Sequence, residues 1–149
     1  MRKILLICAA LAFLPALSQQ KEGIKIVESK KIELTSELSP EQISRYNGLF
    51  LKFVAALKAE DRDAVKGLIS DKVKTVVNDD VLRVLSGGIS FTRKTEVYRS
   101  GLQKLLDNET YPAIQYKYAD DPQDPPRDVI TVIFENNGKI MGVKPDYRE

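Results

Sequence analysis

The segment that most constrains the fold is residues 39–57, which have the pattern of an unusually apolar amphipathic helix. Ser39-Pro40-Glu41-Gln42 is a strong helix start, because Ser39 can cap the helix, proline suits the first helical position and Gln42 completes a capping box. Apolar side chains then recur at steps of three and four residues, namely Ile43, Tyr46, Phe50, Phe53, Val54 and Leu57. A helix this apolar must be covered on more than one side, which predicts a sheet that wraps around it.

The remaining pattern predicts two more helices and a run of strands. We expect a short helix after the Asp61-Arg62-Asp63 break and a third from Lys94 to Leu106. The expected strands cover residues 73–77, 89–91, 111–118, 129–134 and 139–143, with 81–85 ambiguous and a proline-rich loop at 120–126. Asn136-Asn137-Gly138 predicts a tight hairpin, because Asn and Gly tolerate positive φ. The order indicates an α+β fold, with a curved antiparallel sheet wrapped around a long N-terminal helix and two further helices.

The first 18 residues have the pattern of a cleavable secretory signal. Arg2 and Lys3 precede eleven apolar residues, and Ala16 and Ser18 occupy the two positions where a signal peptidase reads small side chains. The apolar run is shorter than the roughly 20 residues that span a bilayer. We therefore expect cleavage after Ser18, a periplasmic or secreted protein, and no stable membrane anchor. Cleavage would remove the only cysteine, Cys8, and two of the 23 basic residues, which leaves 21 against 21 acidic ones.

The mature chain is expected to contain an arm and one domain. Residues 19–38 carry alternating apolar side chains at Ile24, Ile26, Ile32 and Leu34, interrupted by two lysines, so that an edge strand and a loose arm are both open. Residues 39–149 have the length and composition of a single domain.

The absence of histidine restricts the chemistry. It excludes Ser-His-Asp and Cys-His catalysis and every His-ligated zinc or iron site. Four carboxylates at Asp120, Asp121, Asp124 and Asp128 suggest a calcium loop, but their spacing is not that of the twelve-residue loop, which favours a solvated turn. Basic residues in the middle of the chain alternate with acidic ones. We therefore expect no metal, no cofactor and no nucleic-acid partner.

Two stretches of the chain resemble a known superfamily. KFVAALKAEDRDAV at 52–65 is similar to a first helix, a tight acidic turn and a second helix, and FENNGKI at 134–140 is similar to a final hairpin. Both are features of the nuclear transport factor 2-like superfamily, whose cone-shaped, cystatin-like α+β fold is shared by the ketosteroid isomerases. The resemblance spans roughly residues 43–145 and implies a third helix at 93–106. The chain is about one strand short of this pattern, and residues 24–34 could supply that strand.

The positions that matter for isomerase chemistry are apolar in this chain. The resemblance places the oxyanion-binding tyrosine at Phe53, the carboxylate base at Val77 and the late aspartic acid at Ile130. None of these side chains can move a proton or donate a hydrogen bond. The alternative is a small cofactor-free isomerase or hydratase that uses a displaced carboxylate, Asp79 or Asp80, with a tyrosine, either Tyr46 or Tyr98.

The sequence favours an exported, non-catalytic binding or interaction module. A small apolar ligand would lie at the mouth of the cone, against Phe50, Phe53, Leu57, Val77, Phe91, Tyr98, Tyr116 and Ile130. The same side chains could instead fill a closed core. Apolar residues on both faces of 129–134 predict a homodimer through the outer face of the sheet. A third hypothesis is a protein that covers a partner, with residues 19–38 as a docking arm.

Overall fold

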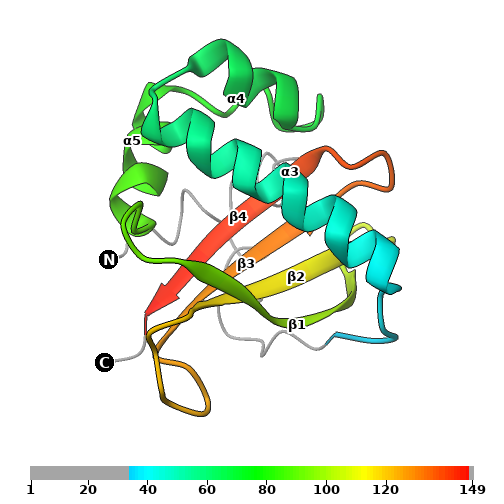
Figure 1. Cartoon of the computed structure of the whole chain (residues 1–149). Helices are drawn as coiled ribbons and strands as arrows, with labels where there is room; N and C mark the ends of the chain where they lie inside the picture. The colour runs from blue at the N-terminus through cyan, green and yellow to red at the C-terminus, as the bar shows by residue number, and fades with distance from the viewer. Residues whose placement is uncertain (1–33, 148–149) are drawn as a thin grey trace.

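Three helices precede four strands in residues 34–147, the part of the chain that the computed structural model describes. The helices are α3 (Pro40–Lys58), α4 (Arg62–Leu68) and α5 (Asp79–Gly88), and the strands are β1 (Thr95–Lys104), β2 (Thr110–Tyr118), β3 (Asp128–Phe134) and β4 (Ile140–Tyr147). Figure 1 shows α3 crossing one face of the sheet, with α4 and α5 gathered near one of its ends. The predicted α+β class is confirmed. The predicted signal peptide and most of the predicted arm lie outside the described residues.

The sheet is an antiparallel meander with the strand order β1-β2-β3-β4. Its last hairpin turns at the predicted Asn136-Asn137-Gly138 segment. The backbone N–H of Glu135 donates to the carbonyl of Lys139 at 2.8 Å, and Gly138 adopts a φ of 92°. Glycine is favoured at this position because a Cβ would be strained at that angle.

The first described helix, α3, begins at the capping box that the sequence predicts. The Ser39 hydroxyl accepts a hydrogen bond from the Gln42 N–H at 3.2 Å, and the Gln42 side chain accepts one from the Ser39 N–H at 2.9 Å, which completes the predicted capping box. Glu60 turns the chain out of the helix with a φ of 56°. The Asp61 carboxylate then caps α4 by accepting a hydrogen bond from the N–H of Ala64 at 3.0 Å.

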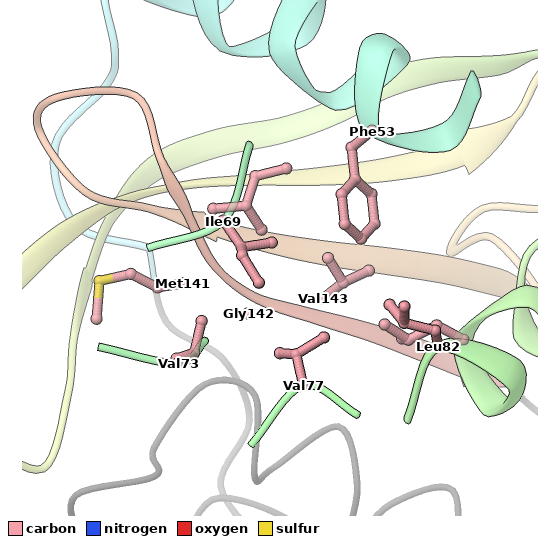
Figure 2. A pocket seen from close by; sticks show the side chains of 10 residues that line it. Phe53, Ile69, Val73, Val77, Leu82, Met141, Gly142 and Val143 are labelled. Carbon is pink, nitrogen blue, oxygen red and sulfur yellow. The ribbon is translucent and has the colours of Figure 1, made fainter. Parts of the chain in front are cut away.

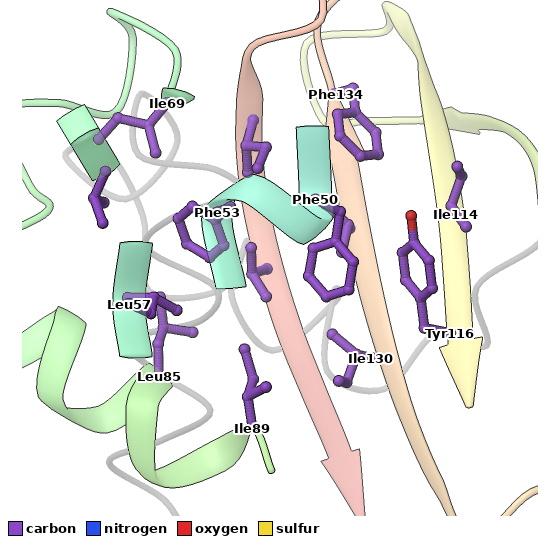
Figure 3. Packing of buried hydrophobic residues seen from close by; sticks show 14 of the residues in the cluster. Phe50, Phe53, Leu57, Ile69, Leu85, Ile89, Ile114, Tyr116, Ile130 and Phe134 are labelled. Carbon is purple, nitrogen blue, oxygen red and sulfur yellow. The ribbon is translucent and has the colours of Figure 1, made fainter. Parts of the chain in front are cut away.

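The main core lies between α3 and the inner face of the sheet. Two aromatic pairs join these layers, since Tyr46 stacks on Phe134 with ring centroids 4.7 Å apart and Phe50 stacks on Tyr116 at 4.3 Å. Figure 3 shows Phe50 of α3 facing the ring of Tyr116 on β2. The helix is therefore held to the sheet by large, flat side chains that interdigitate, as in a well-packed protein interior.

The predicted helix at residues 94–106 is wrong, because this segment forms β1. A register irregularity between Val97 and Arg99 separates two regular stretches of pairing with β2. Across it, Val97 pairs with Tyr116 and Ser100 pairs with Ile114, so inward-facing positions are three residues apart instead of two. A β-bulge of this kind gives a strand a spacing that resembles a helical repeat.

Two further predictions in residues 73–91 fail for local reasons, and the ambiguous segment between them is resolved. Residues 73–77 form turns instead of a strand, because the N–H groups of Val76 and Val77 both donate to the carbonyl of Val73 at 3.1 Å. The ambiguous residues 81–85 are helical within α5, whose first turn is capped by the Asn78 side chain. Residues 89–91 are not a strand either, since Ile89 is only the extended residue that ends α5.

Two glycines offer a matched test of this geometry. Replacing Gly138 by alanine forces a Cβ into a positive-φ turn and to within 2.8 Å of Leu49 Cδ1, so Gly138→Ala should lower the free energy of unfolding by about 1–2 kcal/mol. Gly48 lies inside α3 with open space where a Cβ would stand, so Gly48→Ala should raise it by about 1 kcal/mol. Urea unfolding measures both, and equal effects of the two substitutions would contradict the fold.

Candidate functional site

The predicted ligand-pocket residues mostly lie in the main core. Six of them are buried in one hydrophobic cluster, namely Phe50, Phe53, Leu57, Val77, Tyr116 and Ile130. Phe91 is half-buried and packs against that cluster. Tyr98 is half-buried on β1, where the guanidinium of Arg99 lies 5.2 Å from its ring centroid. The fold therefore gathers the inner members of the set and leaves Tyr98 at the edge of the sheet.

The space between these side chains is almost closed. An apolar cavity of about 10 Å³ lies beside Phe53 and Val77, which is the size of a single water molecule. Figure 2 shows Phe53 descending from α3 toward Val143 of β4, with Val77 and Leu82 beside them. No polar surface lines this cavity, so it has nothing to offer a water molecule and stays dry.

The three positions at which the resemblance places catalytic groups all lie in this core. Phe53 and Val77 line the 10 Å³ cavity, and Ile130 lies on β3 in the same hydrophobic cluster. Each side chain is at most 8% exposed. These positions pack the interior, and they supply neither a proton acceptor nor a hydrogen-bond donor.

The main core contains one hydroxyl without a partner. Tyr116 is 0% exposed, and among the described residues no group lies within hydrogen-bonding distance of its Oη. Burial raises the pKa of this phenol well above its usual value, because the phenolate would be charged in an apolar surrounding. Tyr116 is therefore a neutral packing residue at neutral pH.

The carboxylates of the alternative site lie in water. Asp79 and Asp80 begin α5 and line an open groove of about 530 Å³ between α4 and α5. Their side chains are 66% and 71% exposed, and each forms an ion pair, Asp79 with Arg62 at 3.0 Å and Asp80 with Arg83 at 2.7 Å. Both carboxylates are therefore solvated partners of surface ion pairs.

The two tyrosines of the alternative site lie elsewhere. Tyr46 is 2% exposed in the core, and Tyr98 is on β1. Neither tyrosine lines the groove that contains Asp79 and Asp80. The structure thus brings the two carboxylates together and leaves both tyrosines outside their groove.

A charge cluster that the sequence did not reveal organises the acidic loop at 118–128. The guanidinium of Arg93 lies 4.0 Å from the centroid of the Tyr118 ring. It donates to Asp120 with a shortest distance of 2.6 Å and to Asp128 Oδ2 at 3.3 Å. The Asp121 carboxylate accepts backbone N–H groups, including that of Arg127 at 2.6 Å. Three of the four carboxylates are therefore engaged, and residues 34–147 contain no cluster of acidic or sulfur side chains that could hold a metal ion.

The outer face of the sheet carries a second, smaller cluster, which we call the outer cluster. Its buried members are Leu105, Tyr111, Ala113, Ile133 and Met141, and Leu34 packs against them. Beside the outer cluster, Gln115 and Thr131 are buried and joined by a hydrogen bond of 3.2 Å. The predicted homodimer through this face stays a prediction.

Comparisons with known proteins add no family to this description. A scan of protein-family models, a search of curated proteins and a search of solved structures each found no match. None of the helices in residues 34–147 has both the length and the apolar character needed to cross a bilayer.

The buried tyrosine hydroxyls provide a paired test of the core. Tyr116→Phe removes a hydroxyl that has no partner, so we expect the free energy of unfolding to rise by about 1 kcal/mol. Tyr111→Phe removes a hydroxyl that donates to Asp107 Oδ2 at 2.6 Å, so the same quantity should fall by about 1 kcal/mol. Chemical denaturation of both variants checks the difference, and a loss of stability in Tyr116→Phe would show that its hydroxyl has a partner.

The Arg93 cluster predicts sensitivity to acid. The hydrogen bond from Arg93 lowers the pKa of Asp120, and the N–H groups of Gln123 and Arg127 lower that of Asp121. A carboxyl whose pKa is lower in the folded state stabilises the protein above its unfolded pKa of about 4, and this contribution is lost as the pH falls through the lowered value.

We therefore expect Asp120→Asn to flatten the loss of stability between about pH 5 and pH 2. Asp124 is the matched control, because it lies in the same loop and forms no hydrogen bond or ion pair with the described residues. Urea unfolding at a series of pH values makes the comparison. An identical pH profile for Asp120→Asn and the unsubstituted protein would contradict the role of the cluster.

Proposed function

We propose that the chain is an exported, non-catalytic interaction module built on the nuclear transport factor 2-like plan. The long helix α3 lies against an antiparallel sheet, and α4 follows a tight acidic turn. Strands β3 and β4 form a hairpin that turns within residues 134–140, one of the two stretches that carry the resemblance. The third described helix is α5, which lies upstream of the position that the resemblance implies. Export rests on the charged start, the apolar run and the small residues before position 19.

The observation that carries the proposal is the filled interior at Phe53, Val77 and Ile130. An enzyme or ligand carrier of this plan needs a concave space in the interior with a few polar groups directed into it. Here the apolar pocket lined by Phe53 and Val77 holds about 10 Å³, with no polar lining. That volume is far below the roughly 300 Å³ at which small-molecule pockets begin.

The surface offers more room than the interior. The groove between α4 and α5 has a volume of about 530 Å³ and presents both charges, with Arg62 and Lys66 on one side and Asp79 and Asp80 on the other. Its apolar floor includes Val65 and Leu82. An open groove of mixed charge suits a polar segment of a partner protein better than a small apolar ligand.

The proposal predicts that small apolar molecules do not bind to the unsubstituted protein. Benzene added to the mature chain should leave the methyl NMR signals of Leu57 and Val143 unchanged, because no space next to them can hold it. Phe53→Ala should lower the free energy of unfolding by about 3–5 kcal/mol and open a dry cavity that binds benzene.

The Phe53→Ala variant serves as the positive control for this measurement, and circular dichroism shows whether it is folded. Saturable binding of benzene to the unsubstituted protein, with shifts at Leu57 or Val143, would overturn the filled interior. It would favour the ligand-binding or enzymatic alternative instead.

A further inference from the structure

The outer face of the sheet is buried in a single chain, although all three described helices pack on the opposite face. The pairing register places Gly101, Ala113, Ile133 and Gly142 in one row that runs across all four strands. All four residues are buried, Ala113 being 0% and Ile133 7% exposed. The helices pack in the main core on the inner face, so a different part of the molecule must cover this row.

The described chain begins at the edge of this row. Thr35 pairs with Leu102 at the free edge of β1, through hydrogen bonds of 2.9 Å and 2.7 Å between their backbone groups. A Cβ on Gly101 would stand 2.6 Å from the Ser36 carbonyl oxygen and 2.9 Å from Leu34 Cβ. The backbone at 34–36 therefore lies directly on Gly101, and only a glycine allows so close an approach.

The direction of the chain leads from this contact onto the outer cluster. Leu34 packs against that cluster, and residues 24–33 are joined to it through the chain. Three strand spacings of about 4.8 Å separate Gly101 from Gly142, which is about 14 Å. An extended chain covers that distance in four or five residues at about 3.3 Å each.

The sequence before Leu34 suits an apolar surface. Side chains two residues apart point to the same side of an extended chain. Ile32, Ile26 and Ile24 lie two, eight and ten positions before Leu34, so an extended arm presents them on the side that Leu34 uses, together with Lys30 and Glu28. The opposite side carries Lys25, Val27, Ser29, Lys31 and Glu33.

We propose that residues 24–33 of the same chain dock on the outer cluster and cover the row from Gly101 to Gly142. We call residues 24–36 the strap. The pairing of Thr35 with Leu102 holds one end of the strap at the edge of β1, and the isoleucines of residues 24–33 contact the outer cluster. The surface that the sequence predicts as a dimer interface is then occupied in the free monomer. A partner can bind there only by displacing the arm. This inference does not depend on the proposed function.

Thiol labelling of the mature protein tests the strap, because residues 19–149 contain no cysteine. Met141→Cys places a reporter in the outer cluster, and Lys104→Cys provides an exposed reference on β1. We expect a small thiol reagent to label position 141 at least about ten-fold more slowly than position 104, because a covered thiol reacts only when the arm opens.

Two variants of residues 24–33 test whether this arm covers the outer cluster. Replacing Ile24, Ile26 and Ile32 together by serine should speed labelling at position 141 at least about ten-fold. Replacing Lys25, Val27 and Lys31 by serine alters the opposite side of the same arm and should change the rate less than about two-fold. Equal rates in both arm variants would overturn the proposal. So would slow labelling that depends on protein concentration, since a second copy would then be the cover.

A substitution outside the arm gives an independent readout. Gly101→Ala pushes a Cβ against the backbone at 34–36 and should speed labelling at position 141, whereas Gly87→Ala has open space and should not. Circular dichroism confirms that each variant is folded. Unchanged labelling in a folded Gly101→Ala protein would show that residues 34–36 do not lead a strap onto this face.

Discussion

The packing of α3 on the inner face of the sheet determines most of this structure. Phe50 stacks on Tyr116 and Tyr46 stacks on Phe134. These two aromatic pairs fix where α3 lies over the sheet and how far it is from the strands. Together with Phe53, these side chains fill the space between α3 and the sheet. The close packing between α3 and the sheet follows from the size of the side chains on this helix.

Charged groups are excluded from that interior and gather at its edges. Arg93 draws Asp120 and Asp128 into a cluster beside Tyr118, and Asp79 and Asp80 pair with arginines in the solvent. Exposed pairs of this kind contribute little to stability individually, but the Arg93 cluster connects the loop after β2 to the segment before β1. These charged groups therefore lie at the surface and not in the core.

Local signals in the sequence predicted the elements that depend on local physics. The capping box at Ser39 and Gln42 and the turn at Gly138 are both present, because each is determined by a few neighbouring residues.

The segment at 94–106 was mispredicted because its bulge shifts the alternation of side chains, and a bulge arises only from pairing with β2. The Arg93 cluster joins residues 27 and 35 positions apart, a contact that no short motif announces. The sequence predicted that Phe53, Val77 and Ile130 give the candidate site an apolar lining. It did not predict whether these side chains leave a pocket or fill the core.

The most direct test of the filled interior is a crystal structure of the mature protein determined under xenon pressure. Xenon enters dry apolar cavities that are large enough to hold it, and it requires no chemical recognition. We expect no xenon between α3 and the sheet, because the pocket beside Phe53 holds only about 10 Å³. A well-occupied xenon site in contact with Phe53 or Tyr116 would contradict it and restore an internal ligand pocket.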